Sequence, residues 1–141
     1  NGIKICLGHE AVWGKEIGAI KKIYQTKQFL PLSSLVGTVT EHALIPEYIN
    51  WMVEHFPRLK GMGLHAIIDS GNGAGGTVLT ELVKKFEWKQ VTLQCIEVDG
   101  NYPHHEADPT VEKNMVDVKH ALATTHASVG IGLDGDCESC Q

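Results

Sequence analysis

Three carboxylate side chains stand at every second position near the end of the chain: Asp134, Asp136 and Glu138. Gly135 lies between the first two and gives the backbone the freedom to curl, so the three side chains can converge. Converging anions repel each other unless a cation lies between them, and oxygen ligands suit a divalent ion such as Mg²⁺. The spacing therefore predicts a Mg²⁺ site. An acidic surface turn is the alternative, because Asp-Gly is also common in turns.

A glycine-rich segment, Gly71–Gly76, matches the pattern G-x-G-x-x-G, which is typical of dinucleotide-binding loops. Asp69 and Ser70 directly precede it, however, and a carboxylate there would crowd a pyrophosphate. The acidic residue Asp99 also lies farther along the chain than the usual interval of about 20 residues. A tight turn that needs small residues is the alternative interpretation. We expect this loop not to bind NAD(H).

The histidines and cysteines give weaker signals. His104 and His105 are adjacent, so in an extended segment they point apart and make poor joint metal ligands. We expect them in a solvated loop. Cys137 and Cys140 have the spacing of redox or zinc pairs, but no second pair completes a zinc site. The remaining cysteines, Cys6 and Cys95, occupy apolar, strand-like runs, where cysteine usually acts as a small hydrophobe.

Short apolar runs alternate with segments of helical spacing between residues 64 and 133. We expect strands at 64–68, 91–98 and 128–133 with helices between them, the second helix capped by Asp108–Pro109. Two successive βαβ units imply a mostly parallel sheet covered by helices, which is a three-layer α/β/α domain. Ligands of such sheets gather at the carboxyl ends of the strands, where Asp69, Asp99 and Asp134 fall.

The first part of the chain is less regular. We expect a strand at the start, up to Leu7, a helix from about Trp13 to Lys27, a connector over 29–40, and a second helix that contains Pro46 and ends at Pro57. A domain boundary is placed at 60/61. Because the chain begins within a strand, we expect residues 1–60 to be a partial domain of the same α/β type. Its apolar faces would need a cover, by docking or by self-association.

Composition restricts the class of protein. The chain has 141 residues, a net charge of -5 and 43% hydrophobic residues, as in ordinary globular domains. The acidic balance argues against a nucleic-acid partner. Its apolar runs are too short to span a bilayer, so we expect no membrane association and a cytoplasmic location.

Read together, these stretches resemble the α-D-phosphohexomutase family, in particular the bacterial phosphomannomutase/phosphoglucomutases. The matching pieces follow the family's order along the chain: 1–4, 67–73, 98–105, 108–110 and 130–136. The resemblance implies that residues 1–60 are the end of the family's first domain with a linker helix. It also implies that residues 61–141 are the second domain, ending in the metal loop Asp-Gly-Asp-x-Asp-Arg.

The resemblance also implies roles for single residues. Lys4 matches a catalytic lysine, and Asp134 and Asp136 match two of three Mg²⁺ ligands. Glu138 stands at the third position instead of aspartate, and Ser139 replaces the arginine. Family members move phosphate between C1 and C6 of a hexose phosphate through a phosphoserine and a bisphosphate intermediate.

The phosphoserine loop would lie before Asn1, so we expect the fragment alone to be inactive, and the choice between glucose and mannose phosphate stays open. We expect weak Mg²⁺ binding, because the chain ends three residues after Glu138 and would hold the loop on one side only. The alternative functions are a non-catalytic binding or interaction remnant and a dinucleotide-binding domain.

Overall fold

The computed structural model describes residues 3–31 and 37–141. The chain forms two compact units, Asn1–Glu41 and His42–Gln141. The first two residues of the expected initial strand, and part of the expected connector, lie outside the described residues. In the described part of the chain, no helix is both long enough and apolar enough to cross a membrane.

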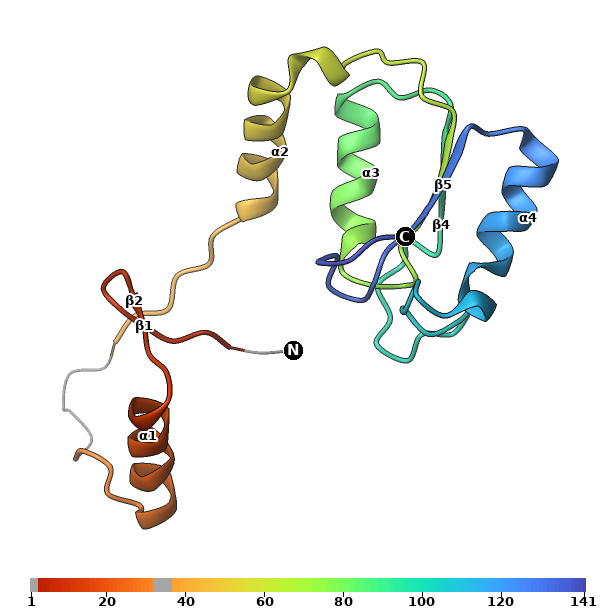
Figure 1. Cartoon of the computed structure of the whole chain (residues 1–141). Helices are drawn as coiled ribbons and strands as arrows, with labels where there is room; N and C mark the ends of the chain where they lie inside the picture. The colour runs from red at the N-terminus through yellow and green to blue at the C-terminus, as the bar shows by residue number, and fades with distance from the viewer. Residues whose placement is uncertain (1–2, 32–36) are drawn as a thin grey trace. The chain divides into compact units, whose positions relative to one another are not determined.

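The first unit contains a small hairpin and one helix (Figure 1). Strands β1 (Cys6–Leu7) and β2 (Glu10–Ala11) pair antiparallel. The expected strand is therefore shorter than predicted. Gly8, at a φ of 64°, turns the chain directly after it, and the N–H of Val12 donates to the carbonyl of Ile5 at 2.8 Å. Helix α1 (Lys15–Thr26) lies where helical spacing predicted it.

Helix α1 has an uncovered apolar face. Ile17, Ile20 and Tyr24 are 42%, 44% and 74% exposed, and α1 has no buried residue. An isolated amphipathic helix gains little stability from propensity alone, because most helical stability comes from packing that apolar face. This exposed apolar face is the reason we predict that another surface packs against the first unit.

The second unit has a three-stranded sheet in the order β4-β3-β5. The strands are β3 (Ala66–Asp69), β4 (Val91–Gln94) and β5 (Val129–Gly132). Both neighbours run parallel to β3, with Asp69 opposite Gln94 on one side and Gly132 on the other. The predicted parallel pairing is confirmed.

Helices cover both faces of this sheet. Figure 1 shows α3 (Gly75–Lys85) on one face and α4 (Val116–Thr125) on the other. All four residues of β3 are buried, as expected of a central strand covered on both faces. The three-layer α/β/α fold class is therefore confirmed. That residues 1–60 are a partial domain of the same type stays a prediction.

Helix α2 (Leu44–His55) belongs to the second unit, together with the short 3₁₀ turn Pro57–Leu59. Ile49 of α2 is 2% exposed. It packs in one cluster with Leu82 of α3 and with Phe86, which directly follows α3. The units therefore divide at 41/42, whereas the sequence placed a boundary at 60/61. Helical spacing identified the apolar face of α2, but the surface it packs against depends on the tertiary fold.

The last helix begins later than predicted. Asp108 accepts hydrogen bonds from the backbone N–H and the hydroxyl of Thr110, at 3.0 and 2.6 Å, and so stabilises a turn. A 3₁₀ segment (Glu112–Met115) follows, and α4 starts only at Val116. The prediction that Asp108–Pro109 caps this helix was therefore wrong: the Asp108 side chain stabilises a turn that ends before the helix begins.

Candidate functional site

The three predicted carboxylates converge. Asp134, Asp136 and Glu138 follow β5, and one oxygen of each lies within 4.8 Å of the others. Asp134 is half-buried, whereas Asp136 and Glu138 are exposed. The group therefore has the donor atoms and the solvent access that a hard divalent cation requires. We call residues 134–138 the carboxylate loop.

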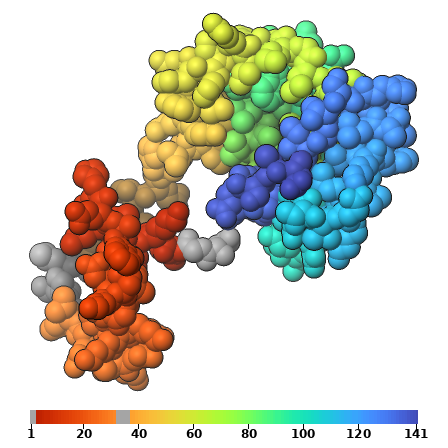
Figure 2. Space-filling model, viewed as in Figure 1, coloured from red at the N-terminus to blue at the C-terminus, as the bar shows by residue number. Residues whose placement is uncertain are grey.

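The carboxylate loop is held at both ends. The N–H of Ser139 donates to Oδ1 of Asp134 at 3.0 Å, and the N–H of Asp134 donates to the carbonyl of Ser139 at 3.2 Å. Gly132 and Gln141 exchange two backbone hydrogen bonds, at 3.0 and 3.1 Å. The terminal segment thus folds back beside β5, on the surface of the second unit (Figure 2, dark blue). The expected one-sided attachment of this loop was wrong.

The glycine-rich segment packs directly against the carboxylate loop. A Cβ atom on Gly73 would lie 2.6 Å from the carbonyl oxygen of Gly135, and one on Gly75 would overlap Sγ of Cys137. The N–H of Ala74 donates to the same carbonyl of Gly135 at 2.9 Å. Small residues are therefore needed here so that the two loops can approach each other.

The backbone donors of the glycine-rich segment already have acceptors. The N–H of Gly71 donates to Oδ1 of Asp69 at 2.7 Å, and that of Asn72 donates to the carbonyl of Cys95 at 2.7 Å. The N–H of Gly73 donates to the carbonyl of Ser70 at 2.8 Å. A pyrophosphate would need these same donors. The geometry thus accounts for the glycine pattern as a tight turn.

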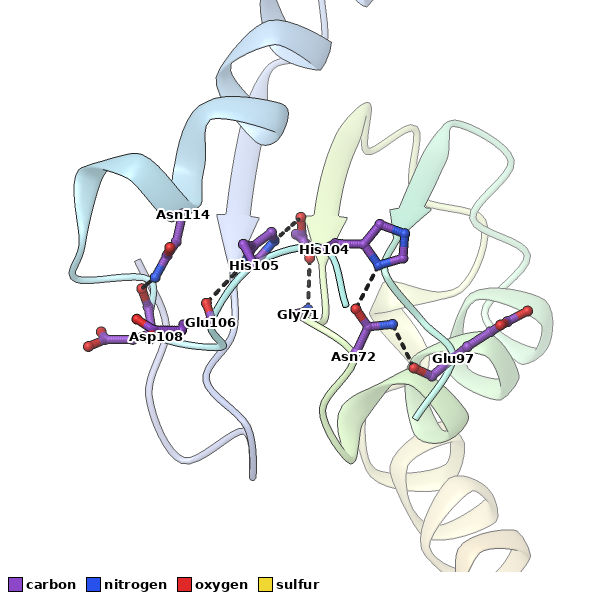
Figure 3. A network of polar contacts seen from close by, with 9 residues as sticks. Gly71, Asn72, Glu97, His104, His105, Glu106, Asp108 and Asn114 are labelled. Atoms are coloured by element: carbon purple, nitrogen blue, oxygen red, sulfur yellow. Dashed lines mark hydrogen bonds and ion pairs between the residues drawn. The ribbon is translucent and has the colours of Figure 1, made fainter. Parts of the chain in front are cut away.

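The adjacent histidines point apart, as predicted, and both contact the start of the glycine-rich segment (Figure 3). Nδ1–H of His104 donates to Oδ1 of Asn72 at 2.8 Å, and Nδ2–H of Asn72 donates to the carbonyl of Glu97 at 2.8 Å. Nε2 of His105 lies 3.2 Å from Oδ2 of Asp69. With a side chain only 15% exposed, His105 is not part of a solvated loop, and that expectation was wrong.

A second cluster, not predicted from the sequence, is made by Asp69, Cys95 and His105, whose ligand atoms all lie within 4.8 Å of one another. Burial, followed by the Asp69 carboxylate, raises the pKa of the Cys95 thiol to about 12. Burial alone would lower the pKa of His105, but its hydrogen bonds to the Glu106 carbonyl and the Asp69 carboxylate raise it. The available signal was topological: Asp69 ends β3, and Cys95 directly follows the neighbouring β4.

Lys4 lies in the first unit, exposed and just before β1. The carboxylate loop lies in the second unit. The catalytic role of Lys4 and the metal ligands stay predictions.

Comparison with known proteins identifies the second unit. The family model described as phosphoglucomutase/phosphomannomutase, alpha/beta/alpha domain II, matches residues 46–141. The phosphoglucomutase of Neisseria meningitidis serogroup B is 35% identical over 98% of this chain and 29% of its own length. The phosphomannomutase/phosphoglucomutase of Pseudomonas aeruginosa PAO1 is 29% identical over 96% of this chain and 28% of its own length.

A solved structure gives the same assignment. A phosphoglucomutase/phosphomannomutase family protein from Burkholderia thailandensis superposes with a TM-score of 0.73 at 27% identity, over 89% of this chain and 26% of that protein. This chain thus spans between a quarter and a third of the length of these relatives. The family match begins at residue 46, within α2, close to the division between the two units. The chain belongs to the phosphoglucomutase/phosphomannomutase family, and residues 46–141 form its α/β/α domain II.

Proposed function

We propose that this chain is part of a Mg²⁺-dependent phosphohexomutase, which moves phosphate between C1 and C6 of glucose or mannose phosphate. The observation that carries the proposal is the convergence of Asp134, Asp136 and Glu138 at the carboxyl end of β5. Membership in a family whose relatives are phosphoglucomutases and phosphomannomutases supports it.

The carboxylate loop fits Mg²⁺ in its chemistry. It offers three carboxylate oxygens, and Mg²⁺ usually takes one or two carboxylates and completes its shell with water and phosphate. When bound there, the ion would neutralise charge on a phosphoryl group during transfer. The N–H of Ser139 holds Oδ1 of Asp134, so this carboxylate is oriented before any ligand arrives.

Lys4 is the proposed catalytic lysine, because it matches the family's motif in residues 1–4. Its ammonium group would supply a positive charge to a phosphate oxygen. Ser139 lacks the bidentate, permanently charged guanidinium that the family's arginine offers, which predicts weaker phosphate binding than in relatives with arginine.

A non-catalytic binding remnant is the second candidate. The observation that favours it is the pair of adjacent departures at Glu138, the last residue of the carboxylate loop, and Ser139, directly after it. An added methylene at Glu138 moves one ligand, and the missing guanidinium removes a phosphate partner.

A chimera separates the two candidates. Residues 46–141 replace the corresponding domain of the Neisseria meningitidis phosphoglucomutase, and conversion of glucose 1-phosphate to the 6-phosphate is followed with and without Mg²⁺. We expect slow, Mg²⁺-dependent turnover that Ser139→Arg raises and Asp134→Asn abolishes. A folded chimera that stays inactive with both Glu138→Asp and Ser139→Arg would instead support the binding remnant.

The proposal also covers the properties of this chain in isolation. We propose that it has no mutase activity alone, that its ligand in the intact enzyme is a hexose phosphate, and that neither nucleic acid nor membrane is a partner. The exposed face of α1 supports self-association of the first unit. A cytoplasmic location is also part of the proposal.

A further inference from the structure

We propose that Asp69, Cys95 and His105 form a second metal site, distinct from the carboxylate loop, that binds a transition ion such as Zn²⁺. Nitrogen, sulfur and oxygen ligands together suit Zn²⁺, whereas Mg²⁺ prefers oxygen alone. The inference does not rest on the proposed mutase activity.

The three ligand atoms are close enough to share one ion. Each lies within 4.8 Å of the other two. Zinc bonds of about 2.0–2.3 Å in a tetrahedron place neighbouring ligand atoms about 3.3–3.8 Å apart. Small side-chain shifts would therefore close the site, and three protein ligands would leave one position for water.

The hydrogen bonds of His105 indicate a cation between its ring and Asp69. Nδ1 lies 2.9 Å from the carbonyl oxygen of Glu106, and Nε2 lies 3.2 Å from Oδ2 of Asp69. Both ring nitrogens thus face oxygen acceptors, as Figure 3 shows for His105 and Glu106. A neutral imidazole has only one N–H, so its other nitrogen would direct a lone pair at an oxygen. Two arrangements satisfy both contacts: a doubly protonated ring, or Nδ1–H donating to the Glu106 carbonyl while a metal ion binds Nε2 and Oδ2 of Asp69.

A divalent ion leaves the net charge of the cluster the same as two protons do. Without metal, an Asp69 carboxylate, a protonated His105 and a Cys95 thiol sum to zero. With Zn²⁺, the carboxylate, a neutral His105 and a Cys95 thiolate also sum to zero. One ion replaces two protons, and the buried cluster gains no net charge, which avoids the cost of burying an unpaired charge.

The surroundings already hold two of the ligands in place. Metal-binding histidines usually donate their other N–H to a carbonyl or carboxylate, which fixes the ring. Glu106 supplies that carbonyl here. The N–H of Gly71 donates to Oδ1 of Asp69 at 2.7 Å, which leaves Oδ2 to face His105. At 2% exposure, Asp69 cannot swing away into solvent.

Cobalt spectroscopy tests the proposal on the whole chain. A background with Cys6→Ser, Cys137→Ser and Cys140→Ser leaves Cys95 as the single thiol. In this background we expect a sulfur-to-cobalt charge-transfer band that saturates at one Co²⁺ per Cys95 thiol and is displaced by Zn²⁺. Adding Cys95→Ala removes the band, and adding His105→Ala weakens Co²⁺ binding at least about tenfold.

Two further variants test whether the bound ion lies at Asp69, Cys95 and His105. Asp134→Ala with Asp136→Ala removes the carboxylate loop's ligands and should leave the band unchanged. Zn²⁺ should raise the melting temperature of the single-thiol background and not that of its His105→Gln variant. A background that shows native circular dichroism but no charge-transfer band overturns the proposal, whether or not the Cys95→Ala variant folds. A band that survives Cys95→Ala overturns it equally.

Discussion

Gly73 lies directly against Gly135: a Cβ on Gly73 would be 2.6 Å from the carbonyl oxygen of Gly135, closer than such atoms can approach. The turn after β3 and the loop after β5 therefore form one packed unit. The N–H of Leu133 also donates to the carbonyl of Asp69 at 2.9 Å, which adds a second link between the two.

Gly73→Ala should therefore displace the carboxylate loop. We expect a loss of about 1–3 kcal/mol in the free energy of unfolding, the usual cost of overpacking, and weaker Mg²⁺ binding. Urea unfolding and calorimetry measure the two effects. Gly100→Ala is the matched control, since no atom lies within 4 Å of its Cβ position. Equal effects of the two substitutions would contradict the packing argument.

Mg²⁺ binding should depend on the carboxylate loop and be measurable in this chain. Because Ser139 and Gln141 tie the loop back to β5, little ordering entropy remains to oppose binding. In calorimetric titration, Asp134→Asn should abolish the binding signal, and Glu138→Gln should weaken it. Glu54→Gln, an exposed carboxylate on α2, serves as control. A signal unchanged in Asp134→Asn would exclude this loop as the site.

Stability of the metal-free chain should fall as the pH rises above the unfolded pKa of His105, about 6.5. The pKa of His105 is raised in the folded chain, so the folded chain binds this proton more tightly than the unfolded chain does. That stabilisation is complete below the unfolded pKa of about 6.5 and is lost as the pH rises through the higher folded pKa. Urea unfolding in chelator from pH 6 upward measures this slope. His105→Gln should flatten it, whereas His120→Gln, at an exposed site on α4, should leave it unchanged.

NAD(H) should not bind to the glycine-rich segment. The N–H groups of Gly71, Asn72 and Gly73 already donate to acceptors within the domain. A fluorescence titration with NADH should show no saturation up to millimolar concentrations. Micromolar binding that Gly73→Val abolishes would contradict this prediction.

Ile49 should contribute to the stability of the second unit. It is 2% exposed against Leu82 and Phe86, so Ile49→Ala should cost about 2–5 kcal/mol. Ile17→Ala, at a site 42% exposed on α1, should cost far less. Chemical unfolding followed by Trp88 fluorescence reports on this region, since the Trp88 ring stacks on Phe86 with centroids 5.1 Å apart. Equal losses for the two variants would mean that α2 is not part of this core.

The sequence by itself determined the α/β class and the carboxylate loop. Apolar runs and helical spacing are local patterns, and their alternation restricts the second unit to parallel strands with crossover helices. The spacing of Asp134, Asp136 and Glu138 is equally local, because all three side chains lie within one short loop after β5. The motifs that carry the family resemblance lie in the same stretches.

Tertiary structure decided what depends on residues far apart in the chain. Asp69, Cys95 and His105 come together only because β3 and β4 are neighbours and the loop after β4 folds back over the turn after β3. Likewise, α2 joins the second unit because Ile49 finds a surface on α3, and no local pattern specifies which surface an apolar face will meet. The late start of α4 has a local reason instead: the Asp108 side chain bonds Thr110 in a turn, and the Nδ2–H of Asn114 donates to the Asp108 carbonyl at 2.9 Å.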